Sequence, residues 1–151
     1  YSKTGISNLI NSEEGVLFAE LYINDDGEAK IIQIAESGAN NNLVRIFYRG
    51  DIATPVFRFQ IISQNSNTFL EEVAFSPNNI YKIAFKYILN NISVYVNGLE
   101  VANGVGTMPI NLNELIFDNA TLTTPFYGKV KQLQIFKTAL TPTQLATLTT
   151  I

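Results

Sequence analysis

Short runs in which apolar and polar residues alternate recur along nearly the whole chain, with turn-forming residues between them. Such runs predict strands, because successive side chains of a strand point to opposite faces. A spacing of roughly one run every 8 to 12 residues is typical of an antiparallel sandwich or barrel. We therefore expect an all-β chain with strands at residues 15–23, 30–36, 43–49, 55–63, 68–75, 81–87, 92–97, 99–102, 114–118 and 128–136.

Two tight turns connect three of these runs into a predicted meander over residues 81–102. Asn90-Asn91 separates the first two runs, and Asn97-Gly98 separates the second from the third. Asparagine tolerates left-handed backbone angles, and Asn-Gly is typical of the type I′ turn of a two-residue hairpin.

The run GKVKQLQIF, residues 128–136, breaks its alternation once. A β-bulge in this strand would bring all of its apolar residues to the core side. These residues are Val130, Leu133 and Ile135.

Only TPTQLATL, residues 141–148, favours a helix. Thr141 and Gln144 have the spacing of a capping box, in which each side chain caps a backbone N–H group at the start of the helix. Leu145 and Leu148 would then face the sandwich as a short plug.

The length and the residue types narrow the classes of protein to consider. A chain of 151 residues is most simply one domain, here residues 1–151. It contains no cysteine and no histidine, which excludes thiol nucleophiles, Ser-His dyads, histidine-ligated zinc and disulfides. No apolar run approaches the roughly 18 residues needed to cross a bilayer, so we expect no membrane insertion. The net charge of −3 argues against a nucleic-acid partner.

Glycoside hydrolysis needs two carboxyl groups that face one sugar. The catalytic strand of sandwich-fold glucanases has the pattern Glu-x-Asp-x-x-Glu, and this chain lacks it. Glu13-Glu14 and Glu71-Glu72 are adjacent pairs whose members point to opposite sides of a strand. We expect no catalytic residues.

Calcium is an alternative at two short acidic segments. Asp25, Asp26 and Glu28 lie in NDDGE, and Asp118 and Asn119 lie in FDNAT. Their oxygen atoms suit calcium, but Asp-Asp-Gly is equally an ordinary turn, and the fuller spacing of an EF-hand loop is missing. We expect no cofactor and keep Asp25, Asp26 and Asp118 as weak calcium candidates.

The outward positions of several runs carry arginine, amide and aromatic side chains, which suit sugars because sugar hydroxyls need planar hydrogen-bonding groups and sugar C–H faces rest on rings. Guanidinium groups would further favour an acidic glycan. Any antiparallel sheet with one wet face also alternates in this way, and the loop at 40–42 is another candidate. Gln33 and Lys86 share the pattern; the residues we predict to bind ligand are Arg45, Phe47, Arg58, Gln60, Lys82 and Tyr95.

Several segments also resemble a known group of domains. EGVLFAEL, ESGANNNLVRIFY, YKIAFKY with ISVYVNGLEVA, LNELIFD and FYGKVKQLQIFKTALTPTQLATLT occur here in the order seen in laminin G-like or concanavalin A-like domains of phage tail-fibre and other virion-surface proteins. The last segment is the most characteristic. The resemblance implies an antiparallel jelly-roll β-sandwich with one short C-terminal helix, which serves adhesion or carbohydrate binding, usually without catalysis.

These observations lead to one functional hypothesis and one alternative. The hypothesis is a non-catalytic, lectin-like module on a virion surface or in another extracellular setting, which binds a cell-surface polysaccharide or glycan, with avidity from a homo-oligomeric fibre. The alternative is a structural or decoration domain of a virion that acts through protein–protein contacts without glycan.

Overall fold

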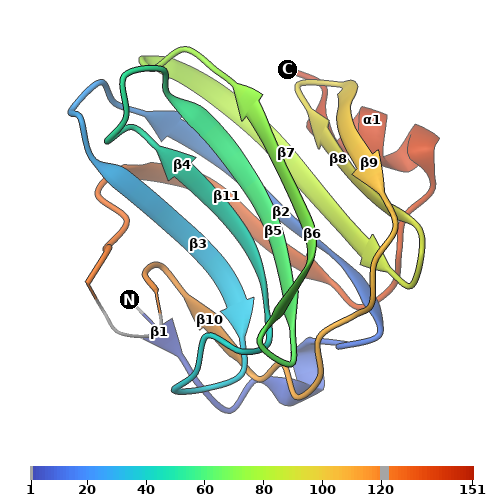
Figure 1. Ribbon diagram of the computed structural model, residues 1–151. Coiled ribbons are helices and arrows are strands. Elements are labelled where there is room, and N and C mark those ends of the chain that lie inside the picture. The colour runs from blue at the N-terminus through green and yellow to red at the C-terminus, as the bar shows by residue number, and fades with distance from the viewer. Residues whose placement is uncertain (1, 120–122) are drawn as a thin grey trace.

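Two antiparallel sheets pack face to face in the computed structural model, which describes residues 2–119 and 123–151 (Figure 1). Sheet A has six strands in the order β1-β10-β3-β4-β5-β6, and sheet B has five in the order β11-β2-β7-β8-β9. The elements are β1 (Ser2–Lys3), the 3-10 helix η1 (Ser7–Leu9), β2 (Glu14–Ile23), β3 (Ala29–Ala35), β4 (Leu43–Arg49), β5 (Val56–Ser63), β6 (Ser66–Ala74), β7 (Asn79–Ile88), β8 (Ile92–Val96), β9 (Leu99–Gly104), β10 (Glu114–Ile116), β11 (Lys129–Phe136) and the helix α1 (Pro142–Thr149).

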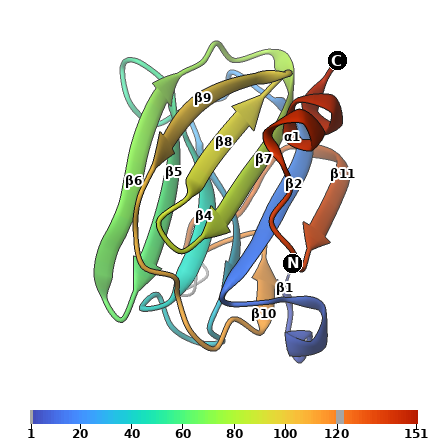
Figure 2. The ribbon, with the colours of Figure 1, turned by 90° about the vertical axis from the view of Figure 1, so that its right-hand side faces the viewer.

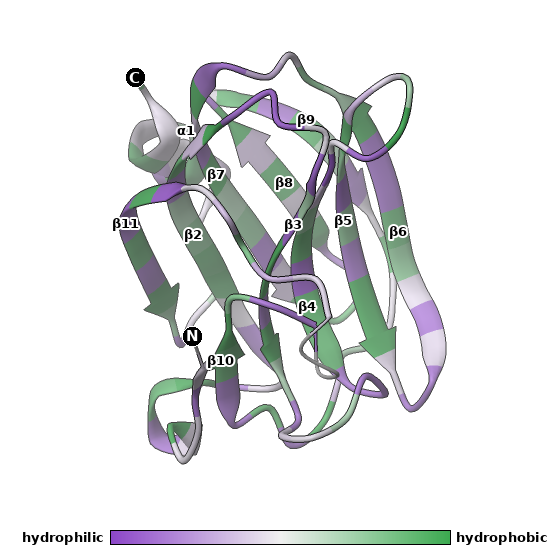
Figure 3. Ribbon diagram, turned by 90° about the vertical axis from the view of Figure 1, so that its left-hand side faces the viewer, coloured by the Kyte–Doolittle hydropathy of each residue, from purple (hydrophilic) through white to green (hydrophobic). Residues whose placement is uncertain are grey.

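The predicted fold class is confirmed: each of the ten expected strands is present with small differences at its ends. Two short elements, β1 and η1, were not predicted. They are two and three residues long, too short to show a hydrophobic period in the sequence. Figure 3 shows the alternation of hydrophobic and hydrophilic residues along β5 and β6.

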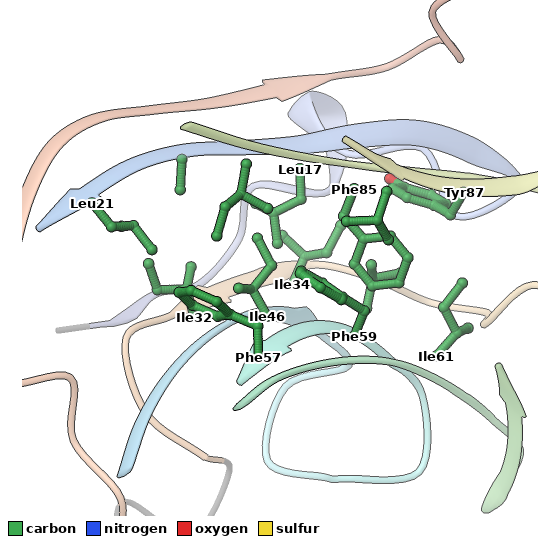
Figure 4. Packing of buried hydrophobic residues seen from close by; sticks show 14 of the residues in the cluster. Leu17, Leu21, Ile32, Ile34, Ile46, Phe57, Phe59, Ile61, Phe85 and Tyr87 are labelled. Atoms are coloured by element: carbon green, nitrogen blue, oxygen red, sulfur yellow. The ribbon is translucent and has the colours of Figure 1, made fainter. Parts of the chain in front are cut away.

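The core lies between the inner faces of the two sheets (Figure 4). Sheet A contributes Phe57 and Phe59, and sheet B contributes Phe85, which meets Phe59 edge to face with 5.8 Å between ring centroids. Tyr87 is fully buried beside them and donates its hydroxyl to the carbonyl of Asn11 at 2.8 Å. Because each strand alternates, the residues between these core positions point away from the core, onto the outer faces.

The predicted meander and the bulge are confirmed. Asn90, Asn97 and Gly98 all have positive φ, as the two turns require, and β7, β8 and β9 pair in succession. The register of β11 against β2 shifts between Val130 and Gln132. The shift turns Val130, Leu133 and Ile135 toward the core.

The helix α1 begins with the expected capping box. Thr141 accepts from the backbone N–H of Gln144, and the Gln144 side chain accepts from the backbone N–H of Thr141. Leu145 is completely buried, and Leu148 is partly buried, so both face the sandwich as predicted. The helix does not plug an end of the core, however: it covers the outer face of sheet B, where Leu145 belongs to a cluster with Phe18, Ala84 and Tyr95 (Figure 2).

Among the described residues, no helix is long and apolar enough to span a membrane.

The packing of α1 predicts a large loss of stability for Leu145→Ala. Removing a fully buried leucine side chain costs about 2 to 5 kcal/mol, because the surrounding structure closes the cavity only partly. Urea unfolding would measure this difference. Thr143→Ala is the matched control, since Thr143 is exposed on the same helix and should change the free energy of unfolding by less than about 0.5 kcal/mol. Equal stability of the two variants would contradict the docking of α1.

Candidate functional site

The six residues predicted to bind ligand were expected to line one exposed sheet, and this expectation is wrong, because they lie on two sheets. Lys82 and Tyr95 lie on β7 and β8 of sheet B, whereas the others lie on β4 and β5 of sheet A. The alternation of a strand identifies its outward residues, but it does not say which sheet the strand joins.

The outer face of sheet B is largely covered. Tyr95 is only 7% exposed, packs in the cluster that holds α1, and donates its hydroxyl to Glu100. Burial and then the hydrogen bond with Glu100 raise the pKa of Tyr95. Lys82 donates to the backbone carbonyl of Thr150 just past the helix, and Lys86 is buried and donates to Asn91. Tyr95 is therefore part of the helix packing.

The outer face of sheet A brings the remaining four residues together. The register pairs Arg45 with Gln60 and Phe47 with Arg58 across β4 and β5. Arg49 follows on β4 with the same orientation, so three guanidinium groups and one ring occupy a small area of two adjacent strands. We call these five residues, Arg45, Phe47, Arg49, Arg58 and Gln60, the sheet A cluster.

Phe47 is at the centre of the sheet A cluster. The guanidinium carbons of Arg45, Arg49 and Arg58 lie 5.6, 5.4 and 5.8 Å from the centroid of its ring. Cations at this distance are attracted by the negative face of an aromatic ring. The ring therefore holds three like charges close together on a partly exposed surface.

Two of the three arginines have carboxylate partners. Arg49 makes a two-pronged ion pair with Asp51, at 2.7 and 3.0 Å, and Arg58 pairs with Glu72 on β6, at 2.6 and 2.7 Å. The hydrogen bond with Arg49 lowers the pKa of Asp51, and the same bond raises the pKa of Arg49. Both pairs are partly exposed, so each stabilises the fold by at most about 1 kcal/mol.

Arg45 differs, because its partner is neutral. Its Nε and Nη2 groups both donate to the amide oxygen of Gln60, whose own NH2 group donates to Asn67 on β6. Across the described residues, no carboxylate lies within ion-pair distance of Arg45. Burial and the nearby charge of Arg58 lower the pKa of Arg45 to about 10.

Gln33 continues the row of Arg45 and Gln60 onto β3, where it pairs in register with Arg45. Its side chain is completely buried, yet neither its amide nitrogen nor its amide oxygen has a hydrogen-bond partner. Leaving a buried polar group unsatisfied costs about 1 to 3 kcal/mol, so such groups are rare and call for an explanation.

Sequence reasoning missed the contribution of β6. Glu72, Asn67 and the exposed Leu70 extend the cluster to the edge of sheet A, where Leu70 pairs with Gln60. The run at 68–75 was expected to be a strand, but its neighbour in the sheet could not be read from its own residues.

The acidic segments are held by local contacts. The Asp26 carboxylate accepts from Lys30, whose side chain is fully buried, and Asp118 accepts from the backbone N–H groups of Asn119 and Thr124. The backbone N–H of Asp25 donates to Asn78. The part of the chain that the structure describes holds no group of three His, Cys, Asp or Glu residues placed to bind a metal. The expectation of no cofactor, with calcium as the weak alternative, stays a prediction.

Asn42, the last residue of the asparagine loop at 40–42, stabilises the fold. Asn42 is buried, accepts from the backbone N–H groups of Gln64 and Ile110, and donates to Glu36. Its side chain thereby joins three loops at one end of the sandwich.

The unsatisfied amide of Gln33 predicts an unusual response to mutation. Gln33→Leu keeps most of the side-chain volume and removes both unpaired polar atoms, so we expect the free energy of unfolding to rise by about 1 to 3 kcal/mol in urea unfolding. Gln60→Leu is the matched control on the same row. It strips Arg45 and Asn67 of their partner and should lower stability by a similar amount. A destabilised Gln33→Leu variant would show that the amide is satisfied.

Comparisons with known proteins agree with this architecture. The family model described as the concanavalin A-like lectin/glucanases superfamily matches residues 11–146. No curated protein matches the chain by sequence.

Solved structures share the fold at low identity. The sialidase carbohydrate-binding module CBM40 of Ruminococcus gnavus, bound to α2,3-sialyllactose, has a TM-score of 0.73 and 12% identity over 93% of this chain and 84% of that one. Domain 4 of a Geobacillus stearothermophilus extracellular arabinanase, in complex with arabinotriose, has a TM-score of 0.67 and 16% identity. The match covers 93% of this chain and 68% of that one. The leech intramolecular trans-sialidase has a TM-score of 0.75 and 13% identity over 93% of this chain. The matched part is only 24% of that enzyme's own length.

Proposed function

We propose that this chain, which belongs to the concanavalin A-like lectin/glucanase superfamily, is a non-catalytic module that binds glycans on the outer face of sheet A. Its sandwich is the fold of a sialidase carbohydrate-binding module and of an arabinanase domain, which were solved with sialyllactose and arabinotriose. Because a shared fold does not by itself imply a shared ligand, the proposal depends on the residues of the face.

The observation that carries the proposal is the sheet A cluster itself. The Phe47 ring offers an apolar surface on which the C–H face of a sugar can rest, and the surrounding guanidinium and amide groups offer planar donors and acceptors for hydroxyl groups. These groups stand on paired strands, so the sheet holds them in place before a ligand binds.

The carboxylates of this face support binding rather than hydrolysis. Asp51 and Glu72, the carboxylates nearest Phe47, are both ion-paired, with Arg49 and Arg58. A glycosidase needs one carboxyl group that stays protonated in order to donate its proton, whereas the hydrogen bond with Arg49 lowers the pKa of Asp51.

The proposal extends to a setting outside the cell, on a phage or a similar surface protein. The resemblance of the segment at 126–149 to virion-surface domains supports this setting. A shallow face of this kind binds one sugar weakly, so several copies in a homo-oligomeric fibre would supply avidity.

Phe47→Ala tests the face directly. Loss of the ring should weaken glycan binding about two- to tenfold, because an aromatic contact contributes about 0.5 to 1.5 kcal/mol. A tetramer of the biotinylated chain on streptavidin would first identify ligands on an array of bacterial and animal cell-surface glycans. Titration calorimetry with the strongest ligand would then compare the variants.

Two controls on sheet B make the test specific. Leu99→Ala removes an exposed apolar side chain of β9, and Tyr95→Phe removes only the hydroxyl that binds Glu100. Both should bind glycan as the wild type does. Binding lost in Tyr95→Phe but kept in Phe47→Ala would place the ligand on sheet B. A verified tetramer that binds no glycan would favour the protein-contact alternative, and glycan turnover abolished by Glu72→Gln would show an enzyme.

A further inference from the structure

Charge on the outer face of sheet A is balanced at two arginines and unbalanced at the third. Asp51 neutralises Arg49 and Glu72 neutralises Arg58, whereas Arg45 faces only the amide oxygen of Gln60. Tyr1 and residues 120–122, which the structure does not describe, include no aspartate or glutamate that could form an ion pair with Arg45. Arg45 therefore carries a positive charge without a carboxylate at ion-pair distance.

The position of Arg45 makes its positive charge unfavourable for the free energy of folding. Arg45 is largely buried, and Arg58 brings a second positive charge near it across the Phe47 ring. A buried charge is ordinarily retained only where an opposite charge or a full set of hydrogen bonds compensates for its lost hydration. Arg45 has five N–H donors in a planar fork, and the two groups that contact Gln60 leave others available.

Gln33 lies beside Arg45 and lacks hydrogen-bond partners for its amide group. Its amide is fully buried, paired in register with Arg45, and unbonded at both polar atoms. Gln33 has no exposed surface through which a ligand could reach it, so Arg45 is the member of this pair that a bound anion can contact. A ligand that offers a negative charge would compensate the unpaired charge of Arg45.

A carboxylate fits Arg45 better than other anions of biological sugars. It is planar and accepts two parallel N–H bonds from a guanidinium fork. The Phe47 ring, 5.6 Å from the Arg45 guanidinium, would lie against the sugar ring that bears this carboxylate.

We infer that the glycan bound by sheet A is acidic, with a sugar carboxylate held by Arg45. This inference rests on the proposed function and names the class of its ligand.

The first experiment compares each acidic glycan with a neutral counterpart. Oligogalacturonate is paired with its methyl ester, which has the same sugar ring without the charge, and sialyllactose is paired with lactose. We expect the folded chain to bind at least one acid at least tenfold more tightly than its neutral partner in titration calorimetry. The pair that shows this preference identifies the source of the carboxylate, a uronic acid or a sialic acid.

The second experiment assigns the preference to Arg45. Arg45→Met removes the charge and keeps the length of the side chain. It should weaken binding of the acid about ten- to a hundredfold and binding of any neutral partner by a smaller factor, because a neutral sugar loses only a hydroxyl contact with Arg45. Arg45→Lys keeps the charge without the fork and should lie between. Lys129→Met, on β11 of sheet B, changes the net charge equally and should bind as the wild type does.

Gln33→Leu separates contact with Arg45 from a general effect on the same row of the sheet. Because Gln33 is fully buried, we expect this variant to bind the acid as the wild type does although it unfolds at higher urea concentration. The urea transitions of the Arg45 variants, measured in parallel, show that they are folded.

Each failure has a distinct meaning. If acid and neutral partner bind equally and Arg45→Met changes neither, the acidic ligand is wrong while glycan binding stands. If Lys129→Met loses affinity as much as Arg45→Met does, the effect comes from net charge, and the contact with Arg45 is wrong. If none of the four glycans nor any other on the array binds, both the inference and the proposed function are wrong.

Discussion

Phenylalanine and aliphatic side chains from the inner faces of two sheets hold this molecule together, and the arrangement of everything outside depends on that contact. Phe57 and Phe59 of β5 meet Tyr81 and Phe85 of β7 edge to face across the sandwich. A strand has only two faces, so burying these residues forces their neighbours outward. Arg58 points away from the core because Phe57 and Phe59 point into it. The core thereby sets the direction of the polar residues proposed to bind.

The outer faces of the two sheets differ in exposure because α1 packs on only one of them. α1 covers the strands of sheet B with Leu145, and Tyr95 becomes part of the packing beneath it. Sheet A keeps a face on which polar side chains of β4, β5 and β6 contact one another and remain partly exposed. A single capped helix therefore decides which of two chemically similar surfaces is open to a ligand.

Within the open face, charge pairing separates residues of one type. Arg49 and Arg58 stand beside carboxylates and serve the fold as well as the surface, whereas Arg45 stands beside Gln60 and Gln33. Buried groups left without partners reduce stability, and proteins tend to retain such costs where a function needs them. Arg45, one of the three arginines around Phe47, and its neighbour Gln33 are the groups that reduce stability in this way.

The local sequence pattern was sufficient to predict every element of this fold except β1 and η1. The ten predicted strands, the bulge in β11, the turns at Asn90 and Asn97-Gly98, and the capping box of α1 each follow from neighbouring residues, because alternation, turn conformation and capping act over a few positions. The sequence by itself also determined that Arg45, Phe47, Arg58 and Gln60 point outward. Only the tertiary structure decided that they share a sheet, that Tyr95 and Lys82 do not join them, and which arginine lacks a carboxylate. These outcomes depend on which strands pair and where α1 docks, contacts between residues far apart in the chain that no local period encodes.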